Sequence, residues 1–182
     1  MTDPNAGLVV LPSDIALEVA VPVVSRRGHR SPGSLNAVGT YLAPQPRYVK
    51  RDVDGKPGDE TLCNFLVREG LRMLDVEIPR LIANGFAGHF RQVSSIGDGW
   101  TLEPRWVARE LAERGVPVVG VQEAPGHGHV TLLQASRSDA EYRQVLEQDS
   151  AWMCQAGASN FAHGLLLNGF RKDLPIWFFS HP

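Results

Sequence analysis

The spacing of the apolar residues changes near residue 115, and this change constrains the fold more than any other feature of the chain. Between about residues 61 and 114, apolar residues recur at the three- and four-residue intervals of amphipathic helices. After residue 115 they occur in short β-prone runs with turns between them. A chain with its helices first and its strands afterwards is typical of an α+β fold with a mostly antiparallel sheet, and we predict that class.

Three helices and four strands are predicted from this pattern. The first helix starts near residue 61, the second covers residues 84–93, and the third covers residues 102–114. The Ile78-Pro79 step ends the first helix, and Gly115 ends the third. The strands cover residues 116–121, 129–134, 151–155 and 175–180.

Residues 1–58 differ from the rest of the chain because they are rich in proline and glycine. The regular structure predicted there is a short strand at residues 19–24 and one or two helical turns at residues 35–42. The 182 residues of the chain suffice for one domain with a substantial core. We therefore expect residues 1–58 to form an irregular arm that packs on a domain made of residues 59–182.

Cys63 and His129 are the two residue types from which a thiol nucleophile is built. Cys63 lies where the first helix starts, and the unpaired N–H groups and positive dipole end of a helix start favour a thiolate. His129 enters an apolar strand, which would hold its ring rigidly enough to take up the thiol proton and deliver it to a leaving group. Each residue also has a structural interpretation, since a single cysteine is often a small buried apolar residue. The pair predicts an enzyme only if the two side chains meet.

The segments around these two residues resemble those of the papain-like cell-wall hydrolases, the NlpC-type and CHAP-type cysteine peptidases and amidases. Residues 63–67, Cys-Asn-Phe-Leu-Val, match the family's nucleophile pattern of cysteine, a small or polar residue, an aromatic residue, an aliphatic residue and valine. Residues 128–133 match its Gly-His-Val-aliphatic base strand, and residues 115–119 match the Gly-x-Pro-Val-Val strand between them. Residues 76–79 resemble the segment after the nucleophile helix in bacterial amidases delivered by contact-dependent secretion. The resemblance spans about residues 59–155.

This resemblance implies a papain-like fold, in which N-terminal helices that include the nucleophile helix pack on the sheet. It implies a cysteine peptidase or amidase that cleaves an amide bond in peptidoglycan stem peptides, with Cys63 as nucleophile and His129 as general base. Peptidoglycan or its fragments would be the partner, and a delivery or immunity protein is a further candidate partner. The chain shows no signal-peptide pattern. We therefore expect synthesis in the cytoplasm and action in the periplasm or on the cell wall after delivery by another route.

A third residue that orients the imidazole has no clear counterpart in the family's pattern. Gln155 is the preferred candidate, because the strand after His129 carries it and its side chain could accept the imidazole N–H. Asn160 is the next candidate and Gln134 the third. Cys154 would face the opposite side of that strand from Gln155, which predicts a structural role for it.

Other functions stay open at the level of the sequence. The same fold and thioester chemistry would serve an acyltransferase or a deamidase, and a non-catalytic phage or secretion protein would simply bury Cys63. A zinc site of His127, His129 and His163 lacks a recognisable ligand spacing. A carboxylate pair of Asp98 and Glu103 has nothing to fix its separation. We therefore predict neither a metal nor another cofactor.

Charge and composition argue against two further classes of partner. The formal net charge of -2 produces no general attraction to nucleic acids or anionic lipids. No run approaches the ~20 apolar residues that span a bilayer, so membrane insertion is not expected. The two cysteines do not make a disulfide framework.

Overall fold

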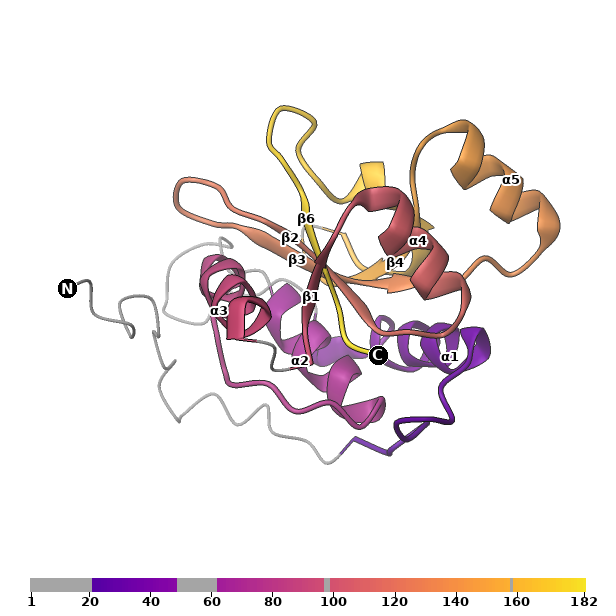
Figure 1. The fold of residues 1–182 in the computed structure, drawn as a ribbon, viewed down its shortest axis with the longest axis horizontal. Helices are drawn as coiled ribbons and strands as arrows, with labels where there is room; N and C mark the ends of the chain where they lie inside the picture. The colour runs from indigo at the N-terminus through magenta and orange to yellow at the C-terminus, as the bar shows by residue number, and fades with distance from the viewer. Residues whose placement is uncertain (1–20, 49–61, 97–98, 158) are drawn as a thin grey trace.

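The computed structural model describes residues 21–48, 62–96, 99–157 and 159–182 (Figure 1). Within these ranges five α-helices surround one six-stranded sheet. The helices are α1 (Pro32–Leu42), α2 (Cys63–Met73), α3 (Ala83–Ile96), α4 (Arg105–Glu113) and α5 (Asp139–Glu147). The strands are β1 (Thr101–Glu103), β2 (Val118–Gln122), β3 (His129–Gln134), β4 (Trp152–Gln155), β5 (Phe161–Leu165) and β6 (Trp177–Ser180). Two 3₁₀ turns, η1 (Pro46–Tyr48) and η2 (Leu166–Asn168), complete the described elements.

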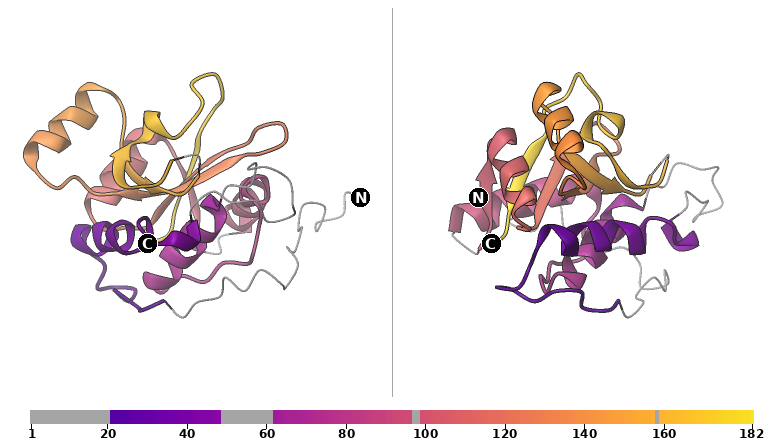
Figure 2. Two further views of the ribbon diagram at one scale, coloured as in Figure 1. Left: turned by 180° about the vertical axis from the view of Figure 1, so that it is seen from behind. Right: turned by 90° about the vertical axis from the view of Figure 1, so that its right-hand side faces the viewer.

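The sheet has the order β1-β6-β2-β3-β4-β5, and every neighbouring pair is antiparallel. The predicted α+β class with an antiparallel sheet is therefore confirmed. Figures 1 and 2 show α1, α2 and α3 on one side of the sheet and α4 and α5 on the other. The central strands β2, β3 and β4 are buried almost throughout, as expected for strands covered on both faces.

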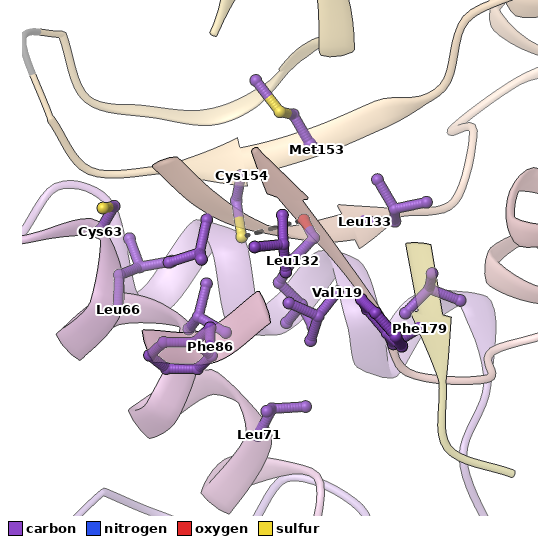
Figure 3. Close-up of a cluster of buried hydrophobic side chains, with 14 of the residues drawn as sticks. Cys63, Leu66, Leu71, Phe86, Val119, Leu132, Leu133, Met153, Cys154 and Phe179 are labelled. Carbon is purple, nitrogen blue, oxygen red and sulfur yellow. Dashed lines mark hydrogen bonds between the residues drawn. The ribbon is translucent and has the colours of Figure 1, made fainter. Parts of the chain in front are cut away.

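The main core lies between the sheet and the α1–α3 layer (Figure 3). Leu66 and Leu71 project from α2 and Phe86 from α3, and all three are completely buried. They face strand residues that are equally buried, among them Val119 and Leu132. Burying a side chain of this size contributes about 1.5–3 kcal/mol, so this contact layer holds α2 firmly on the sheet.

Helix α1 extends the predicted helical turns of residues 35–42 into an 11-residue helix. A capping box of Ser31 and Ser34 starts it, with proline at its first position. Its apolar face is completely buried, and Gly39 on that face lies against the sheet. A Cβ atom on Gly39 would lie only 2.4 Å from the Ala162 carbonyl oxygen and 2.8 Å from Cys154 Cβ. Helix α1 thus belongs to the core, whereas most of the described residues before it are exposed.

Several elements differ from those predicted. Leu102 and Glu103 were expected to be helical, but they form β1, because residues 101–103 pair with the edge of β6, and the helix begins only after Pro104. Helix α5 and strand β5 were not predicted. Only Val145 is buried in α5 and β5 is half-buried throughout, so neither has a strong apolar period.

Two predictions about the N-terminal region fall partly outside the described residues. Residues 21–24 form no strand, and residues 19–20 are not described. The proposed boundary near residue 58 is not described either, so it stays a prediction. No helix among the described residues combines the length and apolar character needed to cross a bilayer.

We predict that Gly39→Ala lowers the free energy of unfolding by about 1–3 kcal/mol, because the added methyl group meets backbone and side-chain atoms that must shift. Chemical denaturation would measure this change. The matched control is Gly33→Ala in the same helix, where the nearest atom to an added Cβ is Ser31 Oγ at 3.7 Å. That change should be neutral or stabilise the protein by about 0.5 kcal/mol. Equal effects at the two positions would contradict the close packing of α1 on the sheet.

Candidate active site

Cys63 is the first residue of α2, as the sequence predicted. The N–H groups of the first helical turn have no intrahelical acceptor, and the N-cap residue Leu62 has no side-chain oxygen to receive them. The adjacent Asn64 side chain donates from Nδ2 to the Leu81 carbonyl oxygen over 2.9 Å, in a buried contact. This bond fastens the start of α2 to the segment that precedes α3, so the Cys63 backbone is held in place.

His129 is the first residue of β3 and pairs with Gln122 of β2. Its Nε2 atom lies 2.8 Å from Oε1 of Gln155, the last residue of β4. The Phe170 ring packs against the imidazole in a T-shaped arrangement, with ring centroids 5.0 Å apart and an interplanar angle of 70°. The imidazole is therefore contacted by Gln155 and Phe170, which come from two separate parts of the chain.

The amide of Gln155 has a defined orientation. Its Nε2 group donates to the Ser159 carbonyl oxygen over 3.0 Å, which leaves Oε1 to accept the proton of His129 Nε2. Gly169 lies against the same amide, and a Cβ atom there would be 2.1 Å from Gln155 Oε1. A larger residue at this position would have to displace the Gln155 amide.

The Cys63 side chain is hydrogen-bonded to His129, and the two groups interact electrostatically. Because Nε2 is directed at Gln155, Nδ1 is the ring nitrogen left for the thiol. Burial works to lower the pKa of His129, but the hydrogen bond and charge of Cys63, and then the hydrogen bond to Gln155, outweigh it. The pKa of His129 is therefore raised above its usual value, which favours a thiolate–imidazolium pair.

The other sulfur and amide candidates lie in structural positions. The Cys154 thiol is completely buried on the α1 side of the sheet, 3.7 Å from the Leu132 carbonyl oxygen, and burial raises its pKa to about 12 (Figure 3). Asn160 receives the Gly157 N–H and donates to the Tyr48 carbonyl oxygen. Gln134 approaches the Cys154 sulfur at 3.5 Å. Of the three candidates for the orienting role, Gln155 is the one bonded to His129.

The histidines proposed as zinc ligands are separated. His127 is exposed in the turn before β3, whereas His163 of β5 pairs with Glu141 and stacks on Trp152. Across the four described ranges, no three histidine, cysteine or acidic side chains gather as metal ligands would. Of the carboxylate pair, Glu103 accepts a hydrogen bond from Ser180, and Asp98 lies outside the described residues.

Three residues next to His129 or Gln155 were not singled out from the sequence. Phe170 packs on the imidazole, Gly169 lies against the Gln155 amide, and Gln122 is the strand partner of His129. Gly169 and Phe170 lie 40 residues or so after His129 and belong to no recognisable motif. The one available signal was the register of the hairpin, since two adjacent predicted strands joined by a short turn place Gln122 opposite His129.

The arrangement can perform nucleophilic chemistry at a carbonyl. It combines a thiol at a helix start, an imidazole in contact with it, and an amide that orients the imidazole. The helix start also offers N–H donors for an oxyanion. In comparisons with known proteins, the sequence matches no protein-family model and no curated protein.

We predict that Cys63→Ala lowers the pKa of His129, because it removes the hydrogen bond and the charge that raise this pKa and leaves the effect of burial. An NMR titration of ¹⁵N-histidine-labelled protein would measure the change. Cys154→Ala is the matched control, and it should leave the titration of His129 as in the wild type because Cys154 faces the core. An unchanged His129 titration in Cys63→Ala would refute the contact between the two side chains.

Proposed function

We propose that this protein is a papain-like thiol hydrolase that cleaves an amide bond in peptidoglycan stem peptides. The observation that carries the proposal is the contact of Cys63 with an imidazole whose other nitrogen is bonded to Gln155. The order of the elements also supports it, because the helix that starts with the thiol is followed by neighbouring antiparallel strands that carry the base and the orienting amide. The choice of peptidoglycan rests on the resemblance of residues 59–155 to cell-wall hydrolases.

In the proposed reaction the Cys63 thiolate attacks the carbonyl carbon of the amide bond. The Cys63 backbone N–H and a neighbouring donor stabilise the resulting oxyanion. The His129 imidazolium then gives its proton to the leaving amine as the carbon–nitrogen bond breaks, which leaves a thioester on Cys63. His129 next takes a proton from water, the resulting hydroxide attacks the thioester, and the acid product leaves as the thiol is restored.

Gln155 acts on this reaction through His129. Its Oε1 atom holds the Nε2–H and so selects the tautomer and ring orientation in which Nδ1 faces the thiol. The hydrogen bond also stabilises the imidazolium form, since Gln155 contributes to the raised pKa of His129. The carboxamide can do this without adding a second charge to a buried site.

The substrate is tested by incubating the protein with purified peptidoglycan fragments and following the products by mass spectrometry. We expect cleavage of an amide bond in the stem peptide by the wild type and by Cys154→Ala, and none by Cys63→Ala. Release of the same products by the Cys63→Ala variant would contradict the hydrolase proposal. An acyl group trapped on Cys63 that passes to an amine or alcohol instead of water would show an acyltransferase.

Thiol labelling separates an enzyme from a protein that merely buries Cys63. In the native protein we expect iodoacetamide to label Cys63 at mildly acidic pH, because the imidazolium favours the thiolate. Cys63 is itself only 1% exposed, so the difference between the thiols is one of charge state. Cys154 should be labelled only after denaturation, since burial raises its pKa to about 12 and its thiol faces the Leu132 carbonyl oxygen instead of an imidazole. Protection of both thiols until the protein unfolds would favour the non-catalytic alternative.

We predict that Gln155→Ala lowers kcat by roughly tenfold to a hundredfold, because the imidazole loses the bond that aligns it. The basic limb of the pH–rate profile should move to lower pH, since one contribution that raises the pKa of His129 is removed. Steady-state kinetics from about pH 5 to 10 would measure both effects. Asn160→Ala is the comparison variant, and a loss as large as that of Gln155→Ala would argue against a special role for Gln155.

A further inference from the structure

The loop of residues 169–174, which follows η2, contacts both His129 of β3 and Gln155 of β4, the base and the orienting residue of the proposed mechanism. Its first residue, Gly169, lies against the Gln155 amide closely enough to exclude a Cβ atom. The ring of its second residue, Phe170, packs against the His129 imidazole in a T-shaped arrangement. One short segment therefore contacts the general base and the residue that orients it.

Phe170 is wedged between the imidazole and β2. The ring is buried, and its Cζ atom would be 3.5 Å from a Cβ placed on Gly120. The ring also meets His129 at a centroid distance of 5.0 Å in an edge-to-face arrangement. Such aromatic pairs contribute about 0.5–1.5 kcal/mol beyond the area they bury. The ring can therefore restrict rotation of the imidazole about its bond to Cβ.

Gln122 ties the loop to the sheet. It is 2% exposed, and its Oε1 atom accepts the Arg171 N–H over 2.9 Å. Its Nε2 group donates to the carbonyl oxygens of Arg171 at 2.8 Å and of Leu174 at 3.1 Å. Both ends of the side-chain amide are thus used on the main chain of the loop. Gln122 and His129 are direct register partners in the β2–β3 pair, so the residue that holds the loop lies beside the proposed base.

We propose that Gln122 and Phe170 are positioning residues, which hold the 169–174 loop against His129 so that the imidazole stays aligned between Cys63 and Gln155. The statement that these two residues serve catalysis rests on the proposed function. The hydrogen bond to Gln155 fixes one ring nitrogen but leaves the ring able to tilt about it. Phe170 blocks that tilt, and Gln122 prevents the loop that carries Phe170 from moving away.

The test compares Gln122→Ala and Phe170→Leu with Arg171→Ala. The first removes the three anchoring hydrogen bonds, and the second keeps an apolar side chain but lacks the aromatic ring that packs on His129. Arg171→Ala is the matched control, because Gln122 binds only the main chain of Arg171 and the guanidinium pairs with Asp173 on the surface. Circular dichroism and thermal unfolding identify the temperature range in which each variant is folded.

Two measurements made on the folded variants need no substrate. The first is the exchange rate of the His129 Nε2 proton with water, followed by NMR and assigned from the spectrum of Gln155→Ala. We expect faster exchange in Gln122→Ala and Phe170→Leu, and the wild-type rate in Arg171→Ala. The second is the pH profile of Cys63 alkylation. The pH at which alkylation reaches half its maximal rate should shift in the same two variants and stay at the wild-type value in the control.

With an active substrate, the two variants should lower kcat by up to about 10²-fold while KM changes little, because a displaced base slows chemistry more than binding. Wild-type proton exchange and an unchanged alkylation profile in both variants, with only a lower melting temperature, would overturn the proposal and leave a structural role. The proton-exchange measurement does not depend on hydrolysis. Failure of the peptidoglycan assay alone would therefore count against the substrate, and not against the positioning loop.

Discussion

The antiparallel pairing of β3 with β2 and β4 is the constraint on which the rest of the molecule depends. In this register Leu132 lies opposite Cys154 and Val119, and the α2 helix packs over Leu132. A shift by one residue would turn every side chain of β3 to the other face of the sheet. It would expose the apolar residues of the core and at the same time carry His129 away from Gln155. The packing of the core and the assembly of the site are therefore enforced together.

The site is stable because its polar groups satisfy one another. His129 and Gln155 are set in largely apolar surroundings, and a buried polar group without a partner costs about 1–3 kcal/mol. Both polar atoms of the Gln155 amide are hydrogen-bonded: Nε2 donates to the Ser159 carbonyl oxygen, and Oε1 accepts from the imidazole. The second ring nitrogen is left for Cys63. Burial by itself would favour a neutral imidazole, and the contact with the thiol reverses that preference, so the raised pKa of His129 depends on the pair being intact.

Residues with a strong local pattern were predictable. The strand of residues 129–134 was predicted with its observed bounds, and the start of α2 at Cys63 followed from the apolar period after it. Gln155 could be named because the strand after His129 carries it and its side chain can accept the imidazole N–H, and it is bonded to the imidazole. Strand alternation placed Cys154 on the opposite face, and its thiol lies in the core. By contrast, β1 was taken for the beginning of a helix, since its three residues are defined only by pairing with β6. Helix α5 and strand β5 were missed because they bury too few apolar residues to show a period.

The sequence by itself determined the α+β class, the helix that begins at Cys63 and the strand that begins at His129, because these depend on propensities and periods within short windows. Only the tertiary structure decided that the thiol contacts the imidazole and that Gln155, and not Asn160 or Gln134, is bonded to it. It also decided that Phe170 packs on the ring and that Gln122 anchors the loop that carries Phe170. The physical reason is that the contacts around the imidazole join residues from 7 to 66 positions apart along the chain. Their distances are set by strand register and by the packing of loops on the sheet, which leave no periodic trace in the sequence.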